Sequence, residues 1–313
     1  MINKLRFEGL SAELASLESL LDEARKYSDI VSTMQLEYKI DQIKKEVELY
    51  KNENTKAAVA LFFSGKPVLG SRGINTDFTG TILKDFQDIV AKVNAKLTIG
   101  DIGSRGRVPN SSTSNLMITN ISKGSFGFIL EELTEQEEAV DTVLKFALDN
   151  VINYLTGIGS LNDEEYETIL EKLDGRTLIS IKDFFITLDQ NGALLRLVEG
   201  NNDYSLDEEY IHRARTRAES IEIKEDEPIF TGKIIGVLPQ HRKFEMLLEG
   251  DIPIYGSLDY SAVKQLNDFL ENNENVVNES WTVKMQVRNV KPLNHTEKTF
   301  YTLISFLEKK SDI

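Results

Sequence analysis

Residues 229–256, with the sequence IFTGKIIGVLPQHRKFEMLLEGDIPIYG, decide the architecture of the C-terminal third of the chain. Apolar, aromatic and β-branched side chains dominate the runs 229–238, 243–248 and 252–255. Turn-forming residues separate the runs, and Pro-Gln-His-Arg stands between the first two. This pattern predicts three consecutive β-strands.

The residues that follow complete a small β-barrel. A helical pattern covers 261–272, and two further strand patterns cover 281–290 and 299–307. The order strand-strand-strand-helix-strand-strand is typical of an OB-type barrel, whose binding loops join strands 1–2 and 4–5. An SH3-like barrel with an inserted helix gives a similar order. Residues 221–313 are therefore predicted to form a small OB- or SH3-like barrel.

Upstream of the barrel, residues 53–160 are predicted to form an α+β domain. The run AAVALFF, followed by Ser-Gly-Lys-Pro, predicts a hairpin over 57–70. Apolar spacing predicts a helix over 77–96. A second hairpin and a closing helix follow, with strands over 116–121 and 126–130 and the helix over 135–155.

An acidic helical connector is expected over residues 161–220. Helical patterns cover 162–173 and 179–189, and a helix over 207–220 leads into the barrel. A short strand pattern covers 193–198.

The N-terminal residues 1–52 are predicted to form a helical arm. We expect a short strand over 3–8 and place Ser11 as the cap of the helix that follows. Leucines recur at helical spacing, but the pattern loses its phase across Ser28–Thr33 before it resumes at Leu36. This break favours two helices or one bent helix over a continuous coiled coil. The arm suits either internal packing or oligomerisation.

Charge is distributed unevenly along the chain, whose net charge is −15. Residues 53–130 carry 9 basic and 5 acidic side chains, a net charge of +4. Residues 131–220 carry 8 basic and 21 acidic side chains, a net charge of −13. Opposite charges of this kind suit complementary surfaces, within one chain or between subunits, or an anion site on 53–130.

A repeated tetrapeptide, Gly-Ser-Arg-Gly, occurs at 70–73 and at 103–106 in the basic segment. Two glycines allow positive φ angles, and consecutive N–H groups can then form an anion nest. Arginine adds a bidentate donor for phosphate or carboxylate. The alternative is two tight turns that need glycine, with each arginine paired to a nearby acid.

The loops of the predicted barrel carry a second set of cations. His241 and His295 fall in the two expected binding loops, beside further basic residues. Together with the arginines and the lysine of the Gly-rich loops, these positions are the candidates for binding an anion or a protein partner. The candidate anion- or partner-binding residues are Arg72, Arg105, Arg107, Lys123, His241, Arg242, Lys243 and His295.

Two further motifs have residues in common with nucleic-acid-binding or catalytic sites. The run 212–217, HRARTR, contains three arginines, but acids four residues before His212 and Arg213 favour local ion pairs. Glu222 and Lys224 form a Glu-x-Lys pair of the kind found in metal-dependent nucleases, with Asp203 or Asp207 as the upstream acid. The acids around Glu225 instead suit a solvated linker.

Composition limits the classes of function. The chain has no cysteine, which excludes disulfides, thiolate metal sites and a cysteine nucleophile. The start MINKLRFEGL lacks the apolar run of a signal peptide, and no stretch approaches a membrane span. We therefore expect a cytoplasmic protein with no membrane, cofactor or metal.

The combined pattern predicts a non-enzymatic interaction subunit that self-assembles, as a homo-oligomer, or joins a larger protein complex. A nucleic-acid or nucleotide binder using the Gly-rich loops and the barrel mouth is the alternative, and a metal-dependent hydrolase is a second one. A composition rich in Lys, Asn and Ile and poor in Pro and Cys suggests bacterial or phage origin. A role in host–phage conflict is a hypothesis that rests on this amino-acid composition alone.

Overall fold

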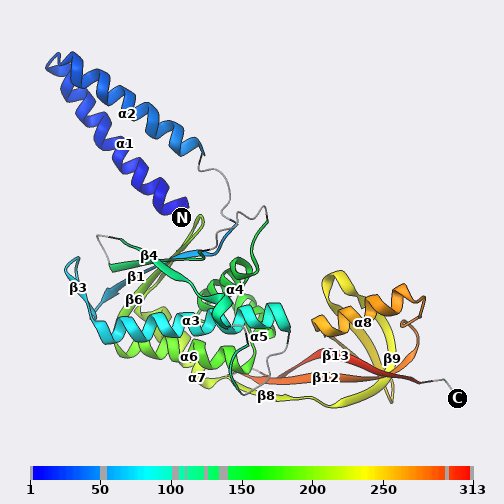
Figure 1. Ribbon diagram of the computed structural model, residues 1–313. Helices are drawn as coiled ribbons and strands as arrows, with labels where there is room; N and C mark the ends of the chain where they lie inside the picture. The colour runs from blue at the N-terminus through cyan, green and yellow to red at the C-terminus, as the bar shows by residue number, and fades with distance from the viewer. Residues whose placement is uncertain are drawn as a thin grey trace. The chain divides into compact units, whose positions relative to one another are not determined.

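The computed structural model describes residues 3–49, 55–100, 106–109, 111–122, 126–133, 140–292 and 296–310. The chain has the predicted α+β architecture: N-terminal helices, an antiparallel sheet with helices, and a C-terminal barrel (Figure 1). Contacts divide it into two compact units. Unit 1 contains 1–83, 115–152 and 187–211, and unit 2 contains 84–114, 153–186 and 212–313.

The N-terminal arm is a hairpin of two helices, α1 (Asn3–Lys26) and α2 (Ile30–Leu49) (Figure 1). Of the two predicted alternatives, two helices or one bent helix, the first is correct. The short strand over 3–8 is wrong, and Ser11 lies inside α1 instead of capping it. Residues 3–8 contain no proline or other strong helix breaker, so the helix of the leucine seam extends back through them.

The two helices of the arm pack against each other through one apolar seam. The side chains of Leu17, Leu21, Ile40 and Ile43 are buried there, and Leu10, Leu14 and Leu36 pack against them. These are members of the two leucine and isoleucine series seen in the sequence, one from each helix.

Unit 1 is built on a five-stranded antiparallel sheet with the order β4-β5-β1-β6-β7. Its strands are β1 (Ala58–Gly65), β4 (Met117–Ser122), β5 (Phe126–Glu131), β6 (Ala193–Glu199) and β7 (Asn202–Leu206). The central strand β1 is apolar on both faces, and residues 58–63 are all buried. The predicted β4–β5 hairpin is confirmed.

The predicted hairpin over 57–70 is wrong in its pairing. β2 (Val68–Leu69) pairs with β3 (Gly73–Ile74), whereas β1 pairs with β5 and β6. At Gly65, with φ of +87°, the chain turns away from β1, and the Lys66 N–H donates to the Gly192 carbonyl. The contact with the turn before β6 therefore takes the place of a local return strand.

Five described α-helices lie between the arm and the barrel along the sequence. Their bounds are α3 (Thr76–Ile99), α4 (Val143–Gly157), α5 (Asp163–Lys172), α6 (Gly175–Gln190) and α7 (Glu208–Ser220), with a 3₁₀ turn at Ser111–Ser114. The predicted start of α4 at residue 135 is wrong. The helix begins at Val143, where the Thr142 hydroxyl accepts a hydrogen bond from the Lys145 N–H (3.1 Å). Residues 134–139 lie outside the described residues.

The C-terminal region is the predicted small barrel. Its elements are β9 (Ile229–Leu238), a 3₁₀ turn (Pro239–His241), β10 (Lys243–Leu248), β11 (Ile252–Leu258), α8 (Tyr260–Glu271), β12 (Ser280–Lys291) and β13 (Lys298–Lys310). β9, β10 and β11 form an antiparallel meander. β12 pairs with β9, and β13 closes the barrel against β12 and, in parallel, against β11. This is the Greek-key order of the OB-type alternative.

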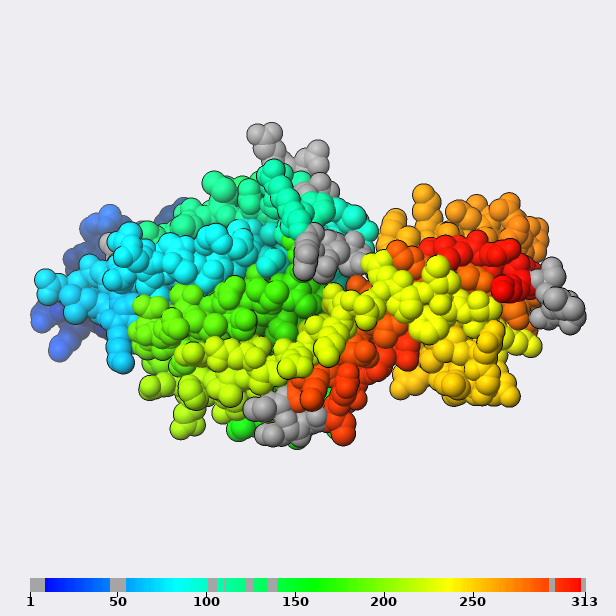
Figure 2. Space-filling model, turned by 90° about the horizontal axis from the view of Figure 1, so that it is seen from below, coloured from blue at the N-terminus to red at the C-terminus, as the bar shows by residue number. Residues whose placement is uncertain are grey.

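One more strand extends the barrel sheet. β8 (Glu222–Asp226) pairs with β12 near residues 287–291. Figure 2 shows β8, in yellow-green, beside the orange and red ends of β12 and β13. β8 contains Glu222 and Lys224 and continues through Glu225 and Asp226, so the expected solvated linker around Glu225 is wrong for these residues: they pair with β12.

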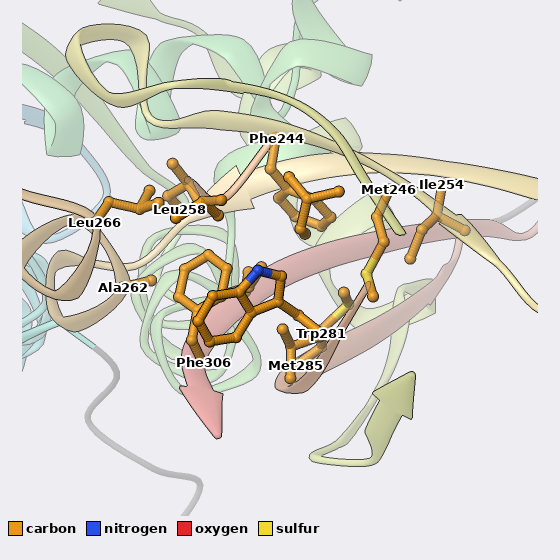
Figure 3. Close-up of a cluster of buried hydrophobic side chains, with 13 residues drawn as sticks. Phe244, Met246, Ile254, Leu258, Ala262, Leu266, Trp281, Met285 and Phe306 are labelled. Carbon is orange, nitrogen blue, oxygen red and sulfur yellow. The ribbon is translucent and has the colours of Figure 1, made fainter. Parts of the chain in front are cut away.

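The barrel core is built from aromatic and aliphatic side chains. The Trp281 ring lies 5.3 Å from Phe306 and 5.1 Å from Phe269, centre to centre. Figure 3 shows Trp281 between Phe306 and Met285, with Leu258, Ala262 and Leu266 on the helix side. Because Trp281 is the single tryptophan of the chain, its fluorescence reports on this core.

Candidate interaction surface

The tip of the arm exposes a cluster of large apolar side chains, which we call the tip stripe. Their exposed fractions run from 48% to 73%. The tip stripe consists of Leu20, Tyr27, Ile30, Val31, Met34 and Tyr38. A patch of this kind on one structural element is typical of a protein-binding surface.

α2 carries apolar side chains on two opposite faces. Leu36, Ile40 and Ile43 face α1 in the buried seam. Ile30, Met34 and Tyr38 are spaced by four residues, which places them on one helix face, and all three are at least 67% exposed. The α1–α2 contact uses only the first face, so the second is left in solvent.

Polar contacts fix the register of this hairpin without covering the tip stripe. Arg25 pairs with Glu37 at 2.7 Å, and Lys44 of α2 pairs with Glu18 of α1 at 3.5 Å. Asp29 caps α2 by accepting from the Ser32 N–H and hydroxyl, and these hydrogen bonds hold the pKa of Asp29 below its usual value. Exposed pairs of this kind contribute little free energy, so the seam stabilises the hairpin.

The sequence contains a signal for the tip stripe that is separate from the leucine seam. The seam loses its phase across Ser28–Thr33, and Ile30, Met34 and Tyr38 follow in a phase of their own. The loss of phase marks the turn between α1 and α2, and the four-residue spacing places these three side chains on a face of α2 other than the seam.

The Gly-Ser-Arg-Gly copies are only partly described. Arg72 lies in the exposed turn between β2 and β3, where its N–H donates to the Leu69 carbonyl (3.0 Å) and Gly70 has φ of +54°. Arg107 is exposed in unit 2, directly after Gly106, whose carbonyl accepts from Arg176 (2.6 Å). Arg105 and Lys123 lie outside the described residues. The first copy therefore has the geometry of a tight turn.

The barrel mouth contains cations that already have partners in unit 2. Lys243 pairs with Glu171 of α5 at 3.2 Å, and Lys298 pairs with Glu167 of the same helix at 2.9 Å. His241 and Arg242 form the turn before β10, where Arg242 adopts a left-handed conformation (φ 50°). His295 lies outside the described residues. Two acids of α5 therefore pair with Lys243 and Lys298, cations at the end of the barrel where an external anion would have to bind.

A buried arginine fixes the same helix to the barrel. Arg288 of β12 is 7% exposed and donates to the carbonyls of Leu170 (3.4 Å) and Glu171 at the end of α5. Nearby, Glu225 of β8 accepts from the Gly175 N–H (3.1 Å) at the start of α6. A cation therefore meets a helix C-terminus and an anion meets a helix N-terminus, the favourable sense for both helix dipoles.

The basic and acidic segments meet directly within unit 2. Lys96 of α3 pairs with Asp174 at 3.4 Å, and Asp174 caps α6 by accepting from the Thr177 N–H and hydroxyl, both at 2.9 Å. Burial alone would raise the pKa of Asp174, but Lys96 and the Thr177 hydrogen bonds outweigh it and hold the pKa below its usual value. This pair is an example of complementary charge within one chain.

Lys92 of α3 makes a contact that resembles part of a nucleophilic site. Its ammonium group donates to the Ser180 hydroxyl and to the Arg176 carbonyl (3.2 Å), and burial lowers the pKa of Lys92. Ser180, however, lies inside α6 and is only 5% exposed. A substrate cannot reach such a hydroxyl, so the contact is a bridge between two helices.

The arginine cluster of α7 is directed inward. Arg213 donates to the Gly159 carbonyl (2.6 Å), and Arg217 donates to the Ile158 (3.2 Å) and Ser160 (2.6 Å) carbonyls after α4. These carbonyls belong to the turn that follows the end of α4 at Gly157. Two of the three arginines therefore serve the fold.

The acids considered for a nuclease site have other partners. Asp203 accepts two hydrogen bonds from Arg196, at 2.9 and 2.8 Å, and Asp207 caps α7 through the Tyr210 N–H (2.8 Å). In the described part of the chain, no group of three or more His, Asp or Glu side chains could hold a metal ion.

No described helix is both long and apolar enough to cross a membrane. Comparison with known proteins does not add a family: no family model, no curated protein and no solved structure matches this chain.

Proposed function

We propose that this protein is a non-enzymatic interaction subunit that binds a protein partner through the tip stripe of its N-terminal arm. The observation that carries the proposal is the pair of apolar faces on α2. One face forms the seam with α1, whereas the other stays in solvent at the end of a helical hairpin.

Covering the tip stripe would release a substantial free energy. Removal of apolar surface from water contributes about 25 cal/mol per Å², and a buried aromatic side chain covers about 150–250 Å². Tyr27 and Tyr38 are 73% and 68% exposed, so covering both rings alone contributes on the order of 5 kcal/mol. Aromatic side chains are also the residues that dominate the binding energy of protein interfaces.

The remaining polar features support a protein partner over the two alternatives. Lys243 and Lys298, the cations considered for nucleic acid, pair with acids of the same chain. The net charge of −15 opposes binding to a polyanion. Asp203 and Asp207, considered for metal-dependent hydrolysis, are engaged as an ion pair and a helix cap.

A photo-crosslinking amino acid at Met34 tests this proposal in the cell that makes the protein. We expect one discrete crosslinked product, because a specific interface presents one partner surface to this position. The same crosslinker at Ala15, an exposed position of α1 outside the tip stripe, is the control. Equal and weak crosslinking at both positions would contradict the proposal.

A further inference from the structure

We infer that the partner of the arm is a second copy of this chain, packed antiparallel along α2 with Met34 on the two-fold axis. This inference rests on the proposed function, because it names the partner of the same surface.

The spacing of the stripe residues carries the symmetry. Ile30, Met34 and Tyr38 lie one helix turn apart on one exposed face, with Met34 in the middle. In an antiparallel pair centred on Met34, each Ile30 lies opposite Tyr38 of the second copy. A large ring then packs against a branched aliphatic chain, and the flexible methionines fill the axis. Such a self-complementary patch is what a two-fold interface requires.

The charges beyond the stripe favour the antiparallel arrangement over a parallel one. Asp41 and Lys45 follow Tyr38 on the same side of α2 and are exposed. A parallel pair would place each of them beside its own copy and would align the two helix dipoles. In the antiparallel pair Asp41 lies beside the other arm's tip, where the last turn of α1 carries Lys26, and Lys45, four residues farther along α2 at ~1.5 Å each, lies beyond that tip. Asp41 then belongs to the polar rim of the interface.

The exposed area is sufficient for a stable pair. The stripe offers two tyrosines and four aliphatic side chains, each 48% to 73% exposed. With aromatic side chains contributing about 150–250 Å² each, the total is on the order of the ~800 Å² per partner that stable interfaces bury. In this arrangement the two α2 helices form the centre of the interface, and each α1 lies on the outer side of its own α2.

The absence of cysteine makes this geometry directly testable in the full-length chain. Met34→Cys places a single thiol on the proposed axis, and mild oxidation is expected to give a covalent dimer. Ile30→Cys is the matched control. In the antiparallel pair the two Ile30 positions lie about 12 Å apart along the helix axis, eight residues at ~1.5 Å each, beyond the ~7 Å limit for a disulfide. Mixing Ile30→Cys with Tyr38→Cys is expected to restore the crosslink.

Light scattering over a concentration series measures the association itself. We expect a reversible dimer for the unmodified chain and for Ala15→Glu. Met34→Glu brings two like charges together at the axis and is expected to weaken the dimer about 100-fold. Circular dichroism of Met34→Glu must match that of the unmodified chain, and Met34→Cys gives an independent readout through its crosslink.

The outcomes separate this inference from the proposed function. A monomer at every concentration, with no Met34→Cys crosslink, overturns the second copy as partner. A self-crosslink of Ile30→Cys equal to that of Met34→Cys overturns the antiparallel geometry. If the chain is monomeric while the photo-crosslinker at Met34 captures a different protein, the inference fails and the proposed function stands.

Discussion

The guanidinium group of Arg288 in β12 donates a hydrogen bond to the main-chain carbonyl of Glu171 in the last residues of α5. The same group lies 5.1 Å from the centre of the Phe300 ring. Burial lowers the pKa of Arg288, and Glu225 and Asp174 oppose this effect. One buried cation therefore binds the barrel to the negative end of a helix dipole.

Arg288→Ala is expected to lower the free energy of unfolding of unit 2 by about 2–4 kcal/mol. The substitution leaves two helix carbonyls without their donor and opens a cavity beside Phe300. Urea unfolding followed by Trp281 fluorescence measures the change. Arg107→Ala, at an exposed position, is the control and should stay within about 0.5 kcal/mol. A decrease in the free energy of unfolding of less than about 1 kcal/mol for Arg288→Ala would contradict the proposal that Arg288 holds α5 to the barrel.

The barrel was predictable because its information is local. In the strands Ile229–Leu238 and Lys243–Leu248, the predicted and observed bounds coincide. Each strand is long and rich in β-branched or apolar residues, and the turn between them contains proline. The choice between OB and SH3-like order depended on the pairing of β11 with β13, which is a contact distant in sequence.

Other parts depended on long-range contacts that no local pattern contains. β7, with the sequence NDYSL, lacks strand-forming character and exists because β6 pairs with it at the sheet edge. Val68–Leu69 is predicted to pair with the strand before it but pairs with Gly73–Ile74. Turn-forming residues stand on both sides of it, so the local sequence allows either pairing. At the arm, the seam was predictable from leucine spacing. The exposed apolar face of α2 could not be predicted from the spacing, because the sequence does not show which apolar residues of the helix are buried against α1.

Leu17 and Leu20 provide a matched pair of substitutions within α1. Leu17 is 7% exposed in the seam, whereas Leu20 is 48% exposed in the tip stripe. Leu17→Ala is expected to destabilise the arm by about 2–3 kcal/mol, which accelerates amide exchange in α1 and α2 about 30-fold or more. Leu20→Ala should leave exchange nearly unchanged when the chain is dilute. Equal effects would mean that the seam does not hold the arm.

Gly65 is required where β1 ends. It has φ of +87°, and a Cβ atom there would lie 2.3 Å from the Gly192 carbonyl oxygen. Gly65→Ala is therefore expected to cost about 2–3 kcal/mol, from the left-handed backbone and the forced movement of the neighbouring turn. Gly73→Ala, where a Cβ atom would meet nothing within 4 Å, is the control. Thermal unfolding by circular dichroism compares the two, and equal melting temperatures would refute the steric argument.

The acids of α5 test the nucleic-acid alternative. Glu167→Gln with Glu171→Gln releases Lys298 and Lys243 from their pairs. Because the four side chains are between 36% and 51% exposed, we expect a change in stability below about 1 kcal/mol. We also expect no binding of a fluorescent single-stranded oligonucleotide, measured by anisotropy at physiological salt. Salt-sensitive binding by the double variant would support a nucleic-acid site at the barrel mouth instead.

Tyr154 gives the chain a specific sensitivity to alkaline pH. Burial, with Asp174 as a second cause, raises the pKa of Tyr154 to about 12, from 10 for an exposed tyrosine. Below pH 10 both the folded and unfolded chains keep this proton, so the free energy of unfolding is unaffected. Between pH 10 and 12 only the unfolded chain releases it, which favours unfolding. The loss amounts to about 1.4 kcal/mol at pH 11.

Tyr154→Phe isolates this effect, because it keeps the ring and removes the titrating group. The difference in unfolding free energy between the two proteins, from urea titrations followed by Trp281 fluorescence, should be constant from pH 7 to 9. At pH 11 it should shift by about 1.4 kcal/mol in favour of the phenylalanine variant. All other tyrosines and lysines titrate alike in both proteins and cancel in the difference. A difference that does not change with pH would mean that the Tyr154 hydroxyl is as well solvated in the folded chain as in the unfolded one.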